Sequence, residues 1–213
     1  MLNKTDTNSN QIKSNVNLYL LFGKRLFDFT AAFLGLLILA IPIGTIAIII
    51  LVTDGRPILF TQQRVGQEGK LFQIKKFRTM YVRQEGDSTI TVAGDRRITP
   101  IGAYLRRWKL DELPQLWNVM VGEMSFVGPR PDVPGYADKL EGDERKLLLL
   151  RPGITGPATL AYRNEEGILA NVSDPIQYNN EVIYPEKVRL NLEYLKEASF
   201  FKDLAYIYQT IVD

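Results

Sequence analysis

The hydrophobic residues of this chain are concentrated in one block near the N-terminus. The rest of the chain alternates between short apolar patterns and polar turns. Residues 29–52 contain no charged side chain. A straight helix of this length would extend roughly 36 Å, which exceeds the ~30 Å hydrocarbon core of a bilayer. The block therefore predicts a membrane-embedded helix.

Pro42 lies near the middle of this block, where a proline removes a backbone donor and kinks a helix. Each half would then reach about one leaflet deep, roughly 15–20 Å. Both flanks are basic, with Lys24 and Arg25 before the block and Arg56 and Arg64 after it. Because basic flanks favour the cytoplasmic side, they favour a re-entrant hairpin over a spanning helix. Proline also occurs in true transmembrane helices, so the spanning alternative stays open.

The pattern divides the chain into three parts. Residues 1–17 are polar and predict a disordered tail. Residues 18–53 predict an interfacial lead-in followed by the re-entrant membrane helix, and residues 54–213 predict a compact cytoplasmic domain. The expected fold class is α+β and mostly helical, with a small β-hairpin and interfacial amphipathic helices.

The elements of the third part follow from local signals. Two strands around a turn with two glycines predict the hairpin, and Thr99 before Pro100 predicts a capped helix start. The strands are expected at 58–62 and 71–77, the helices at 99–108, 111–120, 138–150, 184–196 and 200–212. Ordered loops are expected at 122–133 and 151–157, and irregular structure at 80–97. The aromatic residues of 200–212 fit either the core or the lipid headgroups.

The chain contains no histidine and no cysteine. This excludes disulfides, histidine- or thiolate-based zinc sites, and nucleophiles that depend on a histidine. The net charge of +2 does not indicate nucleic-acid binding. Catalysis would have to use carboxylates, Lys, Tyr, Ser or Thr, or a hard metal with oxygen ligands. A carboxylate nucleophile suits this limit because it is already ionised at neutral pH.

Asp111 and Glu112 form an adjacent acid pair at a predicted helix start, with Asp111 as the N-cap. A helix start attracts anions such as phosphate, and two carboxylates suit Mg²⁺. Arg106, Arg107 and Lys109 place positive charge beside the pair, where a diphosphate can be gripped. Ordinary helix capping is the alternative for the pair on its own. The order of these features behind a membrane segment favours chemistry on a phosphate.

A series of ordered motifs resembles the bacterial sugar transferase family, the monotopic polyprenyl-phosphate phosphoglycosyl transferases. The resemblance runs from about Lys24 to the C-terminus. The motifs are Lys24-Arg25-Leu26-Phe27-Asp28, Phe60-Thr61-Gln62-Gln63-Arg64-Val65-Gly66, Lys76-Phe77-Arg78-Thr79-Met80, Leu110-Asp111-Glu112-Leu113-Pro114-Gln115-Leu116-Trp117-Asn118-Val119, Met124-Ser125-Phe126-Val127-Gly128-Pro129-Arg130-Pro131 and Arg151-Pro152-Gly153-Ile154-Thr155-Gly156.

The resemblance implies transfer of a sugar-1-phosphate from a nucleotide-activated sugar, usually a UDP-sugar, to a polyprenyl phosphate such as undecaprenyl phosphate. By matched position, Asp111 would be the nucleophile that forms a covalent phosphosugar intermediate. Glu112 would be its partner, and the two would bind Mg²⁺. The resemblance also implies a monotopic protein on the cytoplasmic face of the bacterial inner membrane. Downstream glycosyltransferases are candidate partners, and the oligomeric state stays open.

The resemblance also assigns substrate-binding residues. Arg106 matches a phosphate-gripping position, Lys76, Arg78 and Arg130 match basic positions of the site, and Arg163 matches a nucleotide-contacting arginine.

Two departures from the family pattern bear on these expectations. Ile41-Pro42 replaces the family's Ser-Pro, which affects the sharpness of the bend. Tyr162-Arg163-Asn164-Glu165-Glu166 replaces Asn-Gly-Arg-Asn, which affects the role of Arg163 and the choice of sugar. The chain is expected to be a small member of catalytic-core type, without the several N-terminal transmembrane helices of larger relatives.

Two other functions remain open from the sequence. A non-catalytic, membrane-anchored scaffold for polysaccharide assembly would show no dependence on Mg²⁺ or on Asp111. An anchored domain with a spanning segment would place the two ends of residues 18–53 on opposite sides of the membrane.

Overall fold

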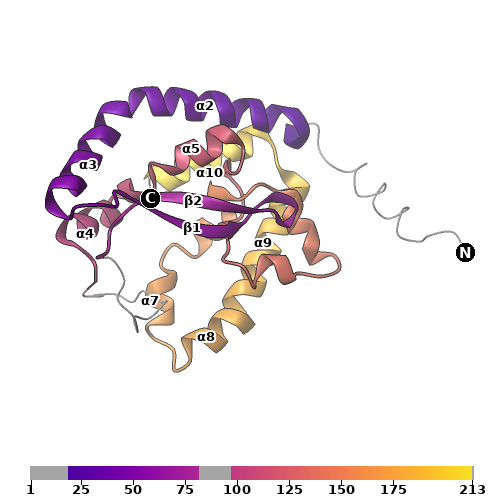
Figure 1. Ribbon diagram of the computed structural model, residues 1–213. Helices are drawn as coiled ribbons and strands as arrows, with labels where there is room; N and C mark the ends of the chain where they lie inside the picture. The colour runs from indigo at the N-terminus through magenta and orange to yellow at the C-terminus, as the bar shows by residue number, and fades with distance from the viewer. Residues whose placement is uncertain (1–18, 82–96, 213) are drawn as a thin grey trace, which may run out of the picture.

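The computed structural model describes residues 19–81 and 97–212 (Figure 1). The predicted tail and most of the stretch 80–97 lie outside these residues. The α-helices are α2 (Lys24–Ile38), α3 (Ala40–Thr53), α4 (Pro100–Arg107), α5 (Gln115–Val121), α6 (Pro157–Ala161), α7 (Glu165–Leu169), α8 (Pro175–Tyr178), α9 (Tyr184–Glu197) and α10 (Phe200–Val212). The strands are β1 (Leu59–Val65), β2 (Leu71–Phe77), β3 (Ser125–Val127) and β4 (Gly153–Thr155).

Short helices of other types connect these elements. The 3₁₀ turns are η2 (Gln67–Gly69), η3 (Leu110–Glu112), η4 (Ala137–Lys139) and η5 (Glu144–Leu149), and the π-helical turns are η1 (Tyr19–Gly23) and η6 (Asn179–Ile183). The expectation of a mostly helical chain with a small β-hairpin is confirmed.

The hydrophobic block folds as two helices, α2 and α3, that meet at 61°. The break lies at Leu39, three residues before the expected position. Pro42 has no N–H for the carbonyl of Ile38, and its ring clashes with that carbonyl, so α2 ends at Ile38 while Pro42 lies in the first turn of α3. Among the described residues, no single helix is long and apolar enough to cross a membrane, but this bent pair qualifies by length and composition.

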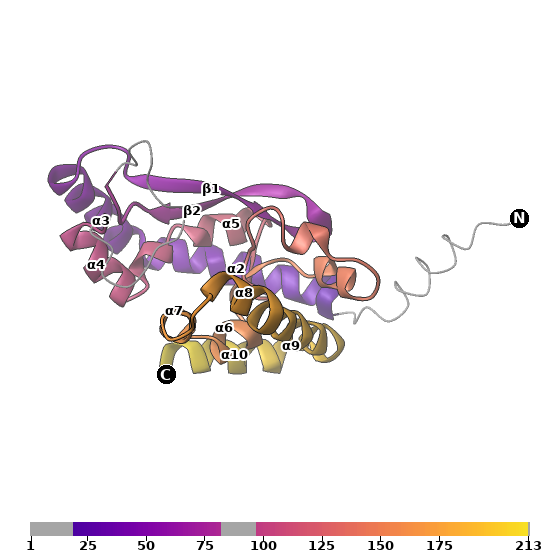
Figure 2. The ribbon, with the colours of Figure 1, turned by 90° about the horizontal axis from the view of Figure 1, so that it is seen from below.

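The elements stack in layers across the molecule. The long helix α2 lies over α5, and α5 packs against the β1–β2 hairpin (Figure 1). In the second view, the hairpin and the pair α9–α10 lie on opposite sides of the molecule (Figure 2). One cluster of apolar side chains joins α2, β2 and α5, and its buried members are Ala32, Phe72, Ile74, Val119 and Met124.

A second sheet forms where the sequence predicts two separate loops. β3 and β4 pair in parallel, with Ser125 opposite Gly153. The loops approach so closely that a Cβ on Gly153 would lie 2.2 Å from the amide nitrogen of Gly128, so neither position accommodates a larger residue. The stretches 122–133 and 151–157 therefore form one unit.

Of the five predicted helices, three are confirmed, the one at 111–120 is α-helical only from Gln115, and the one at 138–150 is wrong. Thr99 caps α4 by accepting a hydrogen bond from the Gly102 N–H at 3.0 Å, and α9 and α10 cover the predicted ranges. The stretch 138–150 is not one helix but the two turns η4 and η5. Gly142 lies between them with φ 54°, a left-handed conformation that interrupts a helix.

The basic side chains at the start of α2 point towards α5 and α10. Lys24 is 4% exposed and pairs with Asp203 of α10, which is fully buried. Tyr19 donates a hydrogen bond to Asp203 at 2.7 Å, and Tyr194 also donates to it. Arg25 donates to the carbonyls of Val119 and Met120 at 2.7 Å each, at the C-terminal end of α5. These two cations thus fasten α2 to the domain and are not free flanking charges.

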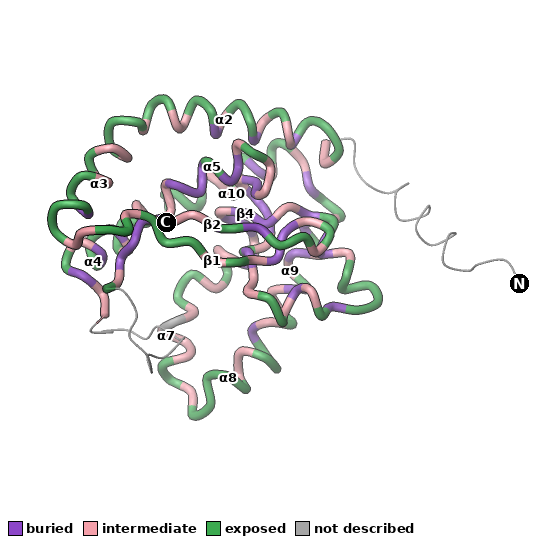
Figure 3. The backbone as a smooth tube through the Cα atoms, viewed as in Figure 1, coloured by how far each residue is buried: buried purple, intermediate pink, exposed green. Residues whose placement is uncertain are grey.

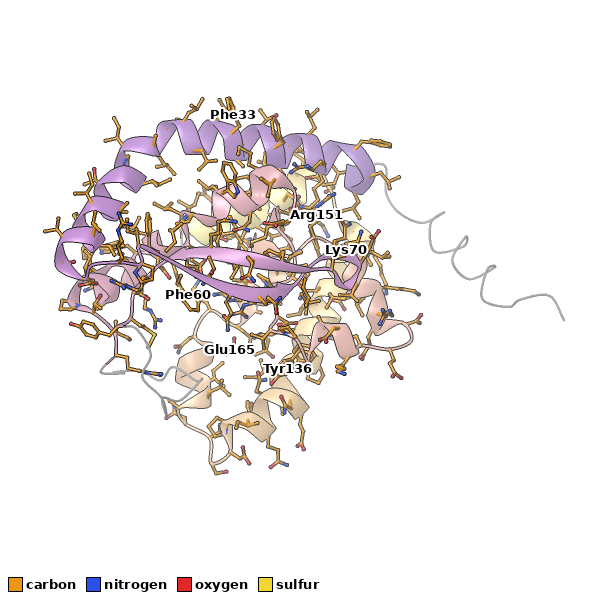
Figure 4. The ribbon with its side chains drawn as sticks, in the orientation of Figure 1. Phe33, Phe60, Lys70, Tyr136, Arg151 and Glu165 are labelled. Carbon is orange, nitrogen blue, oxygen red and sulfur yellow. The ribbon has the colours of Figure 1, made fainter. Side chains whose placement is uncertain are left out.

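The outer sides of α2 and α3 expose many apolar side chains. Buried positions gather around α5 and β4, while much of α2 and α3 is exposed (Figure 3). Phe33 projects outward from α2 (Figure 4). The aromatic residues of α10 divide between the surface and the core. Phe201 is 80% exposed, whereas Tyr206 packs on the ring of Tyr194. The most exposed apolar residues of the bent pair are Leu26, Leu37, Ile38, Ile41, Ile48 and Val52.

The buried pair of Lys24 and Asp203 provides a test of how α2 is held. The change Asp203→Ala leaves the Lys24 ammonium buried without its carboxylate partner, which costs about 3–5 kcal/mol. We expect the thermal midpoint of the purified protein to fall by roughly 10 °C. Asp143→Asn is the control, because Asp143 pairs with Lys146 at the surface and its loss should leave the midpoint unchanged. Equal midpoints for the two variants would contradict the assigned role of Asp203.

Candidate active site

The acid pair lies in a tight 3₁₀ turn, η3, between α4 and α5. The predicted N-cap role of Asp111 is wrong, because α5 begins only at Gln115 with Pro114 as its N-cap. Leu110 and Leu113 pack against the cluster formed by α3, β2 and α4. A 3₁₀ turn places residues three apart on the same side, so the two leucines face the core together. The turn is thus held by its apolar residues, and the acid pair fills the positions between them.

Glu112 binds two cations from distant segments. Its Oε1 atom accepts from Lys76 of β2 at 2.7 Å and from Arg130 at 3.1 Å. Burial would raise the pKa of Glu112, but the charges of Arg130 and Lys76 lower this pKa to about 2. Glu112 is therefore a fixed anion at neutral pH.

Asp111 has the opposite electrostatic environment. The residue is 8% exposed, and none of the described residues donates a hydrogen bond to its carboxylate. Burial raises the pKa of Asp111 and the neighbouring charge of Glu112 raises it further, against the charges of Lys76, Arg106 and Lys109. An ionised Asp111 is thus poorly stabilised in the folded protein. Perturbed carboxylates of this kind are typical of functional sites.

The structure brings some of the predicted basic residues to the acid pair and places others elsewhere. Lys76, Arg106 and Arg130 surround it, and Arg106 is oriented by its Nε–H, which donates to Thr79 at 2.9 Å. Arg78 is 6% exposed and donates instead to the carbonyls of Asp54 and Gly55 after α3.

Arg163 also lies away from the acid pair. It is an exposed residue after α6, and its guanidinium lies 3.4 Å from the carbonyl of Gln209 in α10. Its nucleotide-contacting role stays a prediction from the resemblance.

Asn118 fixes the register between β2 and the acid pair, a role that the sequence analysis did not assign. Its amide donates to the carbonyl of Gln73 at 2.8 Å, and its Oδ1 accepts from the backbone N–H of Lys75 at 3.1 Å. Asn118 is fully buried on α5, the helix that follows the acid pair. The sequence signals for this role are a polar residue inside an apolar helical pattern and the place of Asn118 in the motif 110–119.

The loop that carries Arg130 is held from three sides. Gly153 donates to the carbonyl of Pro129 at 2.7 Å, and Val65 of β1 donates to the carbonyl of Asp132 at 2.9 Å. The hydroxyl of Tyr184 in α9 donates to the Asp132 carboxylate at 3.3 Å, and burial raises the pKa of that carboxyl group to about 6. Arg130 therefore reaches Glu112 from a rigid loop.

The acid pair has the donor set for a metal that substrate oxygens help to hold. In the part of the chain that the structure describes, no group of three or more acidic, histidine or cysteine residues could hold a metal ion. Mg²⁺ is usually bound by one or two carboxylates together with substrate phosphates. Both cations contact Oε1 of Glu112, so Oε2 and the Asp111 carboxylate are the oxygens that fit such an ion.

Comparison with known proteins identifies the family. The model of the family described as "Bacterial sugar transferase" matches residues 19–213, nearly the whole chain. The chain belongs to the bacterial sugar transferase family. This confirms the resemblance seen in the motifs.

Several relatives in this family have curated names. The UDP-galactose-lipid carrier transferase of Erwinia amylovora is 34% identical, over 89% of this chain and 40% of the relative. The undecaprenyl-phosphate glucose phosphotransferase of Komagataeibacter xylinus is 39% identical, over 88% of this chain and 35% of the relative. The exopolysaccharide production protein ExoY of Rhizobium meliloti is 32% identical, over 88% of this chain and 83% of the relative. The chain thus spans about two fifths of the length of the Erwinia relative and most of ExoY.

The raised pKa of Asp111 predicts that removing the charge of this side chain stabilises this sugar transferase. The pKa of Asp111 is raised in the folded protein, so ionisation at pH 7 opposes folding. We expect Asp111→Asn to raise the thermal midpoint at pH 7 by about 1–4 °C. The gain should shrink as the pH falls through the raised pKa of Asp111, because protonation then removes the same charge. A lower midpoint for Asp111→Asn at pH 7 would contradict this account.

Proposed function

We propose that this sugar transferase moves a sugar-1-phosphate from a nucleotide-activated sugar, a UDP-sugar, to a polyprenyl phosphate such as undecaprenyl phosphate. The observation that carries the proposal is the asymmetry of the acid pair. Glu112 is held ionised by Lys76 and Arg130, while Asp111 is buried without a hydrogen-bond donor among the described residues. The names of the relatives, which include UDP-glucose:undecaprenyl-phosphate glucose-1-phosphate transferase of Escherichia coli, support the same substrates.

The reaction proceeds in two displacements at phosphorus. A carboxylate oxygen of Asp111 bonds to the phosphorus that carries the sugar, the bond to the bridging oxygen breaks, and the nucleoside monophosphate leaves with the electron pair. An oxygen of the polyprenyl phosphate then bonds to the same phosphorus, and the bond to Asp111 breaks. The products are a polyprenyl-diphosphate sugar and the regenerated carboxylate. Asp111 is poorly solvated before attack, which favours its reaction with an electrophilic phosphorus.

The basic residues act by charge and position. Lys76 and Arg130 come from separate segments and converge on Glu112, so they can grip phosphate oxygens that approach the acid pair. Arg106 is oriented by Thr79 and contributes positive charge at Asp111. Asn118 keeps β2, and with it Lys76, in register with the acid pair.

Asp111 and Glu112 would hold the magnesium ion that the family resemblance implies. When bound, Mg²⁺ neutralises negative charge on the diphosphate and on the departing phosphate. It would also offset the repulsion between the two carboxylates, which contributes to the raised pKa of Asp111.

The bent pair α2–α3 forms the membrane anchor in this proposal. Its break at Leu39 and its exposed apolar side chains fit a re-entrant hairpin that enters and leaves the bilayer on the cytoplasmic face of the bacterial inner membrane. Arg25 links α2 to the end of α5, so the anchor and the acid pair are held in a fixed relation. The polyprenyl phosphate would then meet Asp111 near the headgroups.

Trapping the intermediate tests the nucleophile. Incubation with UDP-sugar labelled in the phosphate next to the sugar, without lipid, should leave label on wild-type protein and release one nucleoside monophosphate per adduct. Asp111→Asn should form no adduct and lose at least about 10⁴-fold in turnover, because a covalent step is removed. Asp143→Asn is the surface control and should behave as wild type. Robust turnover without an adduct in quenched wild-type enzyme would exclude this mechanism.

The membrane topology can be tested directly because the chain has no natural cysteine. Single cysteines at Asn10, Ile38 and Thr53 are labelled in sealed inverted vesicles with a maleimide that does not cross membranes. A re-entrant hairpin predicts that positions 10 and 53 label from the cytoplasmic side, while position 38, next to the bend, resists labelling. Labelling of 10 and 53 from opposite sides would show that the segment spans the bilayer.

A further inference from the structure

A small pocket next to the acid pair is lined by several basic side chains. Its lining includes Arg64, Lys76, Gln115, Arg130 and Pro131, and none of its lining residues is acidic. Lys76 and Arg130 are the two cations that contact Glu112. Arg64 and Gln115 have no place in the site described so far.

Arg64 reaches the pocket from the hairpin. In the β1–β2 register, Arg64 is opposite Phe72, and Phe60 is opposite Lys76. Paired residues share a face and alternate residues along a strand return to it, so Arg64 and Lys76 project from the same face. The guanidinium donates to the carbonyl of Pro131 at 3.1 Å and to Gln62 at 2.6 Å, while its Nε atom is buried without a partner among the described residues.

Gln115 is a polar side chain at the pocket wall. It is 2% exposed, and its amide forms no hydrogen bond with any residue in the ranges that the structure describes. Its amide atoms are not among the fully buried side-chain atoms that lack a partner, so they are open to the pocket. A ligand oxygen in the pocket can accept a hydrogen bond from the NH₂ group of Gln115.

The charges around the pocket favour an anion. Burial lowers the pKa of Arg64, and the charge of Arg130 lowers it further. Lys76 and Arg130 line the same pocket as Arg64. Glu112 offsets part of this charge from one side, and Asp132, which accepts from Tyr184, does so for Arg64 from the other. Asp111 also offsets part of the charge of Lys76. Because Arg64, Lys76 and Arg130 line one pocket that has no acidic lining residue, an oxyanion in it would relieve the repulsion among them.

We propose that Arg64 and Gln115, together with Lys76 and Arg130, form a phosphate subsite that is used twice in each cycle. It holds first the phosphate of the departing nucleoside monophosphate and then the phosphate of the polyprenyl acceptor. This inference rests on the proposed function and deepens it.

The double use follows from in-line displacement. The entering and leaving oxygens lie on opposite sides of the phosphorus, so the nucleoside phosphate departs on the side away from Asp111. In the second step Asp111 is the leaving group, so the acceptor oxygen must arrive from that same side. A single pocket beside the acid pair can therefore serve both phosphates in turn. Arg64 contributes charge, and Gln115 contributes a neutral donor that does not hold either phosphate too tightly to leave.

The test measures the two half-reactions separately in single-turnover experiments. Adduct formation is followed with labelled UDP-sugar alone, and adduct discharge is followed after addition of undecaprenyl phosphate. Gln115→Leu removes the amide at similar volume, and Arg64→Gln removes the charge. We expect each variant to slow both half-reactions by about tenfold or more. The controls are Gln63→Leu, at an exposed position on the opposite face of β1, and Arg189→Gln on the surface of α9, and neither should change either rate.

Slowing of only one half-reaction, or of neither, would overturn the shared subsite. Thermal midpoints show which variants are folded. If Gln115→Leu or Arg64→Gln does not fold, Gln115→Glu and Arg64→Lys take their places. Gln115→Glu keeps the size but repels an anion, so it should slow both steps.

A second readout separates this inference from the proposed function. Binding of inorganic phosphate to the full-length protein is measured by ³¹P NMR titration without any donor or lipid. Weaker binding to Gln115→Leu and Arg64→Gln than to the controls would support the pocket even if no UDP-sugar reacts. Equal binding by all variants would exclude the pocket as a phosphate subsite even if the transfer reaction is confirmed.

Discussion

The carboxylate of Glu112 is the point on which the arrangement of this site depends. It joins the turn η3 to Lys76 of β2 and to Arg130 of the loop after β3, three segments that are far apart in the sequence. The two cations keep Glu112 ionised in a mostly buried position, with a pKa of about 2. That fixed anion, together with burial, disfavours the charge of Asp111 next to it. One carboxylate thus organises the site, and the other is buried without a hydrogen-bond donor among the described residues.

Buried side-chain contacts also link the apolar helices to the domain. Lys24 and Arg25 open α2, and both make their contacts inside the protein, with Asp203 of α10 and with the last carbonyls of α5. Because α5 directly follows the acid pair, the orientation of α2 and that of the site are set together. The exposed apolar sides of α2 and α3 are then presented in a defined direction relative to Asp111, as the proposed reaction with a lipid-bound acceptor would require.

Much of the local structure could be predicted. Thr99 and Pro100 start α4 because a capping side chain and a preset φ angle act within a few residues. The hairpin and the helices α9 and α10 follow from alternating or helical patterns. The break at Leu39 precedes Pro42 for a local reason, because proline acts on the turn before it. The prediction of two separate loops failed because a distant contact decides there. The stretches around Gly128 and Gly153 pair as strands, since glycine lets the two backbones meet.

The sequence by itself determined the family and the acid pair. It also determined the catalytic possibilities that remain when histidine and cysteine are absent, because side-chain chemistry and motif order are local properties. Only the tertiary structure decided which cations serve that pair. Lys76 and Arg130 reach Glu112, whereas Arg78 holds the turn after α3 and Arg163 lies beside α10. The tertiary structure also showed the contacts of Asn118 with β2 and the pocket lined by Arg64 and Gln115. A charge acts over a few ångströms through space, and folding decides which charges come that close.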